Sequence, residues 1–304
     1  MTYETLWRNL THLYDTGEAK AIVRWVLDVR FGLSMADILC GKVTQLSADD
    51  QTELEKIMQR LESGEPVQYI IGVADFCGRQ FHVDPGVLIP RPETEELCKW
   101  IIDDNKQSSP LILDIGTGSG CIAITLALEI PDAKVTGWDI SEDALRIAKD
   151  NAKSLGAYIT FEQYDILNIS PDSCLLSPDS CLLTPDSCLL SPVSYLLSPD
   201  SYYDLIVSNP PYIQPKESDG IAKNVLDHEP HIALFTPDDK PIIFYQRIGD
   251  YAWQNLNSGG ELYFELNPLT ADLVRDHLRH IGFCEIELRQ DAFGKQRFLK
   301  AIKR

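Results

Sequence analysis

The chain has 304 residues, of which 44% are hydrophobic and 24% charged, a composition typical of a globular protein long enough for two domains. Its formal net charge of -19 argues against a large nucleic-acid-binding surface, because affinity for phosphates comes mainly from Lys and Arg. The chain has no run of about 18 apolar residues and no signal-like start, so we expect neither a membrane span nor secretion, but a cytoplasmic protein. The eight cysteines include no Cys-x-x-Cys pair, so we expect no metal site.

The first part of the chain carries apolar residues at helical spacing, as at Ile22, Val26 and Val29. It holds no candidate catalytic group. We therefore expect residues 1–65 to form an N-terminal helical bundle that serves substrate recognition. Residues 66–92, where glycines and prolines interrupt short apolar stretches, are expected to form a β-hairpin connector.

The remaining residues, 93–304, alternate apolar strand-like segments with helical ones. Such alternation predicts a parallel sheet covered by helices on both faces. The last two strands, expected at about 283–289 and 296–302, are joined by a turn too short for a parallel crossover, so they must pair antiparallel. We expect an α/β fold with a Rossmann-like sheet of seven strands, the last of them antiparallel.

Residues 170–202 interrupt this alternation with a seven-residue repeat, Ser-Pro-Asp-Ser-Cys-Leu-Leu and close variants. A proline in every unit rules out a continuous helix and hence a coiled coil. Long insertions in surface loops cost little closure entropy. We interpret the repeat as a flexible tandem expansion in a surface loop between two strands, with a binding platform as the alternative.

A glycine-rich turn, Gly116-Thr-Gly-Ser-Gly120, follows the first strand of the alternating region and precedes a helix. Its Gly-x-Gly-x-Gly spacing differs from the Gly-x-Gly-x-x-Gly of dinucleotide-binding proteins, so a nicotinamide cofactor is disfavoured. Asp139 ends the next strand, where a carboxylate can accept hydrogen bonds from both hydroxyls of a ribose. Asp165 and Ile166 end the third strand and can hold an adenine by its amino group and its apolar face. Ligands of open α/β sheets bind at these strand ends.

The motif Asn209-Pro-Pro-Tyr212 directly follows the fourth strand. An amide NH2 is a poor nucleophile because its lone pair is delocalised. Acceptors at the Asn209 side chain and the Pro210 carbonyl can hold its two hydrogens and aim the lone pair at a sulfonium methyl, while Pro211 keeps the backbone rigid. The Tyr212 ring can pack on the planar group. The motif thus predicts methyl transfer to a planar nitrogen without a strong base.

With these residues, the chain resembles the release-factor glutamine N5-methyltransferase family, also called the PrmC/HemK family. The resemblance covers nearly the whole chain outside the repeat. It is carried by Pro66–Gly72 with Phe76, Leu88–Glu95, Leu113–Gly120, Val207–Ile213, and Glu229-Pro230 with Ala233-Leu234. Leu-Ile-Pro-Arg-Pro, at the start of the second stretch, is the discriminating motif, because Asn-Pro-Pro-Tyr also occurs in DNA adenine methyltransferases.

The resemblance implies an S-adenosylmethionine-dependent methyltransferase domain at 93–304, with S-adenosylhomocysteine as product. It implies transfer to the side-chain amide nitrogen, N5, of the glutamine in the Gly-Gly-Gln motif of class I peptide-chain release factors. From motif and resemblance together, we expect Asn209, Pro210 and Tyr212 to be catalytic and Asn209–Tyr212 to bind the glutamine. The expected cofactor-binding residues are Gly116, Thr117, Gly118, Ser119, Gly120, Asp139, Asp165, Ile166 and Asn209. We expect a monomer that binds neither nucleic acid nor membrane.

The sequence also allows three other functions. The first is a methyltransferase acting on a ribosomal-protein glutamine. The second is a nucleic-acid adenine-N6 methyltransferase, against which the charge of -19 counts. The third is a cofactor-binding scaffold without activity, which the repeat favours slightly and the intact Asn209–Tyr212 motif disfavours.

Overall fold

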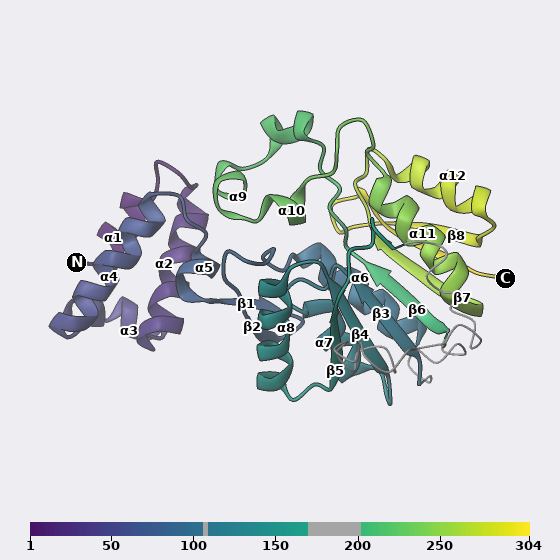
Figure 1. Ribbon diagram of the computed structural model, residues 1–304. Coiled ribbons are helices and arrows are strands. Elements are labelled where there is room, and N and C mark those ends of the chain that lie inside the picture. The colour runs from purple at the N-terminus through teal and green to yellow at the C-terminus, as the bar shows by residue number, and fades with distance from the viewer. Residues whose placement is uncertain (106–108, 170–201) are drawn as a thin grey trace, which may run out of the picture. The chain divides into compact units, whose positions relative to one another are not determined.

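The computed structural model describes residues 1–105, 109–169 and 202–304 (Figure 1). Apart from residue 202, the predicted repeat at 170–202 lies outside the described residues. The chain divides into two compact units. The first comprises Met1–Pro90 and Lys216–Ala233, and the second comprises Arg91–Pro215 and Leu234–Arg304.

The first unit is mainly helical. Its elements are α1 (Tyr3–Asn9), α2 (Thr16–Phe31), α3 (Met35–Leu39), η1 (Lys42–Gln45), α4 (Ala48–Glu62), α5 (Val67–Ile71), β1 (Val73–Phe76), β2 (Arg79–His82) and α9 (Lys223–His228). Residues such as Leu6, Val26 and Leu61 are fully buried in one apolar cluster, which explains the helical spacing of the sequence. Strands β1 and β2 form an antiparallel hairpin.

The second unit is built on a single seven-stranded sheet with the order β5-β4-β3-β6-β7-β9-β8. The strands are β3 (Leu111–Ile115), β4 (Lys134–Asp139), β5 (Ile159–Gln163), β6 (Tyr203–Ser208), β7 (Leu256–Glu265), β8 (Cys284–Gln290) and β9 (Gln296–Ile302). The first five in that order pair parallel, and β9 is antiparallel to both β7 and β8. The predicted fold class, including the antiparallel last strand, is confirmed.

Helices cover both faces of this sheet, as the alternating pattern predicted. They are α6 (Pro92–Asp104), α7 (Cys121–Glu129), α8 (Glu142–Leu155), α11 (Ile243–Asn255) and α12 (Ala271–Ile281). Along the chain, the boundary between the two units falls within the short α10 (His231–Leu234). In Figure 1, α7 and α8 lie on one side of the sheet, and α11 and α12 lie on the other. The central strands β3 and β6 are almost entirely buried, so their carboxyl ends are rigidly placed.

Candidate functional site

The glycine-rich turn joins β3 to α7 and presents its main chain outward. The N–H groups of Gly116 and Thr117 both donate to the carbonyl oxygen of Trp138 at 2.8 Å, which fixes the turn against β4. Gly116 and Gly118 have φ of 76° and 55°, in the left-handed region, and a Cβ on either would meet no atom within 4 Å. The side chains of Thr117 and Ser119, by contrast, are buried. The open surface of the turn is therefore made of backbone, which lets a ligand approach closely.

Asp139 lies beside this turn at the end of β4. Its Oδ2 accepts from the Gly118 N–H and its Oδ1 accepts from the Ser141 N–H, each at 2.9 Å. Burial raises the pKa of this carboxyl, and the two backbone donors oppose that rise. Because a carboxylate oxygen can accept more than one hydrogen bond, both oxygens retain capacity for hydroxyl donors.

Two further side chains, those of Asp114 and Asn151, hold the turn in place by hydrogen bonds, and neither was a candidate from the sequence. The Thr117 hydroxyl donates to Asp114 Oδ2 at 2.7 Å, and Asn151 Nδ2 donates to the Ser119 carbonyl at 2.9 Å. Burial raises the pKa of Asp114 to about 7. Asn151 is a polar residue on the buried face of α8. A polar residue at an apolar position of the helical pattern was the sequence signal that could have indicated its role.

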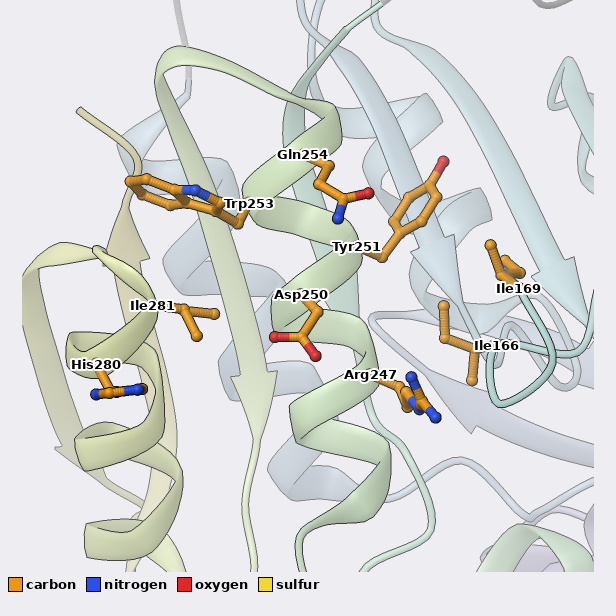
Figure 2. A pocket seen from close by; sticks show the side chains of 9 residues that line it. All are labelled: Ile166, Ile169, Arg247, Asp250, Tyr251, Trp253, Gln254, His280 and Ile281. Carbon is orange, nitrogen blue, oxygen red and sulfur yellow. The ribbon is translucent and has the colours of Figure 1, made fainter. Parts of the chain in front are cut away.

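Asp165 and Ile166 follow β5 at the same edge of the sheet. Asp165 Oδ1 accepts from the Leu167 N–H at 2.9 Å, which closes a turn, and Oδ2 accepts from the amide of Asn168 at 2.6 Å. The Ile166 side chain lines a hollow of about 400 Å³ that is shared with residues of α11, among them Tyr251 (Figure 2). The contact of Asp165 and Ile166 with an adenine stays a prediction.

Asn209 follows β6, the strand next to β3. Ser208 pairs with Ile115, and the Ser208 hydroxyl donates to the Ile115 carbonyl at 2.6 Å. Asn209 and Gly116, the next residue of each strand, therefore leave the sheet side by side. The structure thus brings the start of the Asn-Pro-Pro-Tyr motif to the start of the glycine turn.

The rest of the motif is fixed by bonds on both sides of Tyr212. The Tyr212 carbonyl accepts from Asn267 Nδ2 at 3.1 Å, and Pro210 is buried. The next residue, Ile213, makes two backbone hydrogen bonds. Its carbonyl accepts from the Thr236 N–H at 2.8 Å, and its N–H donates to the Leu234 carbonyl at 3.0 Å. The two prolines and these bonds leave the segment little freedom.

A chain of side-chain hydrogen bonds lies behind the motif. Asn209 Nδ2 donates to Thr94 Oγ1 at 3.3 Å, and the Thr94 hydroxyl donates to Glu265 Oε2 at 2.7 Å. The Tyr212 hydroxyl donates to the other oxygen, Glu265 Oε1, at 3.2 Å. Thr94 belongs to the stretch that carries the family resemblance, but neither it nor Glu265 was a candidate from the sequence.

Burial is the largest influence on the ionisable groups of this chain. It raises the pKa of Glu265, against the lowering effect of the Thr94 and Tyr212 hydrogen bonds and of the Arg297 charge. Burial and the neighbouring Glu265 charge also raise the pKa of the Tyr212 hydroxyl. Tyr212 therefore stays a neutral donor at physiological pH and is unsuited to act as a base.

Among the described residues, no group of three or more His, Cys, Asp or Glu side chains could hold a metal ion. Within that same part of the chain, no helix is long and apolar enough to cross a membrane.

An open glycine turn, a carboxylate on the neighbouring strand and an Asn-Pro-Pro-Tyr motif on a sheet of this order define a class I methyltransferase that uses S-adenosylmethionine. The family described as "Methyltransferase domain" matches residues 106–209, and the family "PrmC N-terminal domain" matches residues 9–72. The methyltransferase domain of METTL16, a solved structure, aligns with a TM-score of 0.50 at 17% identity, covering 80% of this chain and 96% of that one, which supports the fold alone.

Curated relatives identify the family. The release factor glutamine methyltransferase of Bacteroides thetaiotaomicron is 43% identical over 295 residues, covering 97% of this chain and 96% of the relative. The protein of the same name from Flavobacterium psychrophilum is 36% identical, covering 96% and 94%. The chain belongs to the release factor glutamine methyltransferase family.

Proposed function

We propose that this chain transfers a methyl group from S-adenosylmethionine to the N5 amide nitrogen of the glutamine in the Gly-Gly-Gln motif of class I peptide-chain release factors. One observation carries the proposal: Asn209–Tyr212 begins beside the glycine turn, because Ser208 pairs with Ile115. A group held by the motif would therefore lie next to a ligand held by the turn. The full-length relationship to proteins named for this activity supports the same substrate.

The residues of the turn fit the methyl donor. The open space over Gly116 and Gly118 admits a ligand against the backbone, and the Asp139 carboxylate retains acceptor capacity for ribose hydroxyls. The donor would be held by these residues together with Thr117, Ser119, Gly120, Asp165, Ile166 and Asn209. When bound, it supplies an electrophilic methyl group on a positively charged sulfur.

The motif residues would act on the glutamine amide by holding it. Asn209 Oδ1 and the Pro210 carbonyl accept the two amide hydrogens, which favours a pyramidal nitrogen with its lone pair exposed. The Tyr212 hydroxyl is tied to Glu265, so its ring has a fixed plane against which a flat amide can pack. The nitrogen becomes strongly acidic as it gains the methyl group, so its proton can leave to water.

We also propose that the protein works as a monomer in the cytoplasm and binds no nucleic acid. The net charge of -19 supports the last point, because a phosphate-binding surface needs an excess of basic groups.

The test is a competition among substrates. The purified protein is incubated with methyl-labelled S-adenosylmethionine and, separately, with a class I release factor, ribosomal proteins and DNA. We expect label on the release factor alone. Label confined to a ribosomal protein or to DNA would reject the proposed substrate, and donor binding without any transfer would indicate a scaffold.

A further inference from the structure

Asn209 can serve the proposed reaction in only one of its two amide orientations. The substrate presents hydrogens, so the side chain must offer its oxygen, Oδ1, and turn its own NH2 group away. The oxygen and nitrogen of an asparagine amide have nearly the same shape, so shape alone does not select the orientation. A partner with a defined donor or acceptor character must select it.

Thr94 supplies that character because its hydroxyl has a single hydrogen. Glu265, as a carboxylate, can only accept, and the Thr94 hydrogen is directed to Glu265 Oε2 at 2.7 Å. Thr94 Oγ1 is then left with lone pairs alone toward Asn209. It accepts from Asn209 Nδ2 at 3.3 Å, which points Oδ1 of the same amide the other way.

The surroundings of Glu265 hold it in this accepting role. It is buried at the end of β7, its second oxygen accepts from Tyr212, and Arg297 lies near enough to influence its charge. Thr94 is also buried, so bulk water cannot replace either partner. We infer that Thr94 and Glu265 are positioning residues that set the amide orientation of Asn209, and with it the acceptor offered to the substrate nitrogen.

This inference rests on the proposed function for its consequence in catalysis, though not for the orientation itself. The hydrogen bond to Oδ1 strengthens as the substrate nitrogen gains positive charge, so the orientation acts mainly on the transition state. We call the hydrogen bonds from Asn209 to Thr94 and from Thr94 to Glu265 the relay. Loss of the relay should lower kcat and leave the KM for the release factor nearly unchanged.

The first variants change the relay without changing its size. Thr94→Val removes the hydroxyl, and Thr94→Ser keeps it. We expect kcat to fall about 10- to 100-fold for Thr94→Val, and about threefold or less for Thr94→Ser. The dissociation constant for S-adenosylhomocysteine, by calorimetry, should change little in each.

A double-mutant cycle separates positioning from simple support of the fold. If Thr94 acts through Asn209, then Thr94→Val in an Asn209→Ala background should cost nothing further in single-turnover transfer. Wild-type kcat in Thr94→Val, or equal losses from Thr94→Val with and without the Asn209 side chain, would overturn the inference.

A second readout needs no protein substrate and keeps the two proposals apart. The side-chain NH2 signals of Asn209, assigned by their absence in Asn209→Ala, should show slowed hydrogen exchange in the wild-type enzyme and fast exchange in Thr94→Val. Equal exchange rates in the two would reject the orienting role. If wild-type protein labels no release factor while the exchange rates differ as expected, the proposed function fails and the orienting role stands.

Discussion

The two halves of the site are built from different materials. The half proposed for the donor is mostly main chain: the N–H groups of Gly116 and Thr117 are fixed by one carbonyl of β4, and the outer surface is glycine. The half proposed for the acceptor is a relay of side chains, in which Asn209 depends on Thr94 and Thr94 depends on Glu265. The first half is thus sensitive to added atoms, and the second to changed hydrogen-bond character.

This difference suits what each half must do. A backbone cradle recognises the shape of a ligand and needs no particular side chain, so it can be specified by a short local motif. Orienting one amide requires a donor and an acceptor of fixed character, and these come from distant parts of the chain. A change confined to one half should therefore leave the other half largely unaffected.

The largest effect is expected from Asn209→Ala. Loss of the acceptor should lower kcat for release-factor methylation about 100- to 1,000-fold, as for removal of a group that stabilises a transition state. Binding of S-adenosylhomocysteine should weaken far less, because the glycine turn is unchanged. Steady-state kinetics and calorimetry on the same sample measure both. Equal losses in donor affinity and kcat would show that the two halves are not separate.

The next effect is on the donor half, by Gly118→Ala. An alanine at φ of 55° is strained, and its Cβ would enter the open space over the turn. We expect about tenfold weaker binding of S-adenosylhomocysteine, equivalent to about 1.4 kcal/mol. Gly156→Ala is the matched control, since Gly156 has φ of 74°, no atom within 4 Å of an added Cβ, and a position at the far end of α8. Gly156→Ala should bind the donor like the wild type. Wild-type affinity in Gly118→Ala would contradict the role proposed for the open turn.

The acceptor half should respond to pH. Burial raises the pKa of Glu265. When protonated, Glu265 can donate a hydrogen bond to Thr94, and the Thr94 hydrogen is then no longer directed at Glu265. The wild-type kcat should therefore fall as the pH drops through this pKa, and Glu265→Gln should lack that acidic limb. Besides burial, the groups that influence the pKa of Glu265 are Thr94, Glu93, Tyr212 and Arg297. An identical acidic limb in both proteins would assign the titration to another group.

The smallest effect on activity is expected from the support beneath the glycine turn, which should act on stability instead. Burial raises the pKa of Asp114 to about 7 in the folded state, above its ordinary value of 3.8, so the folded protein holds this proton more tightly than the unfolded chain. The resulting stabilisation is complete below the ordinary pKa and is lost as the pH rises to about 7.

Asp114→Asn should remove this dependence. Relative to the variant, the wild type should lose unfolding free energy between about pH 4 and pH 7, by about 1.4 kcal/mol for each unit of pKa displacement titrated in that range. Urea unfolding at several pH values measures the difference. A constant difference across that range would contradict the assignment.

Local patterns predicted the sheet and both motifs, because strand alternation, a glycine turn and Asn209-Pro-Pro-Tyr212 are each written in a few consecutive residues. The relay was not predictable in this way. Thr94 and Glu265 lie 171 positions apart, and only the strand order brings the end of β7 beside the start of α6. Nor did the sequence indicate that residues 216–233 cluster with the N-terminal helices.

The central claim is that a glutamine amide is methylated by an acceptor that Asn209 presents. The most direct measurement is mass spectrometry of a class I release factor after incubation with S-adenosylmethionine and either the wild-type protein or Asn209→Ala. We predict one added methyl group, on the side-chain nitrogen of the Gly-Gly-Gln glutamine, with the wild type and almost none with the variant. A methyl group on another residue, or equal modification by the variant, would contradict the account.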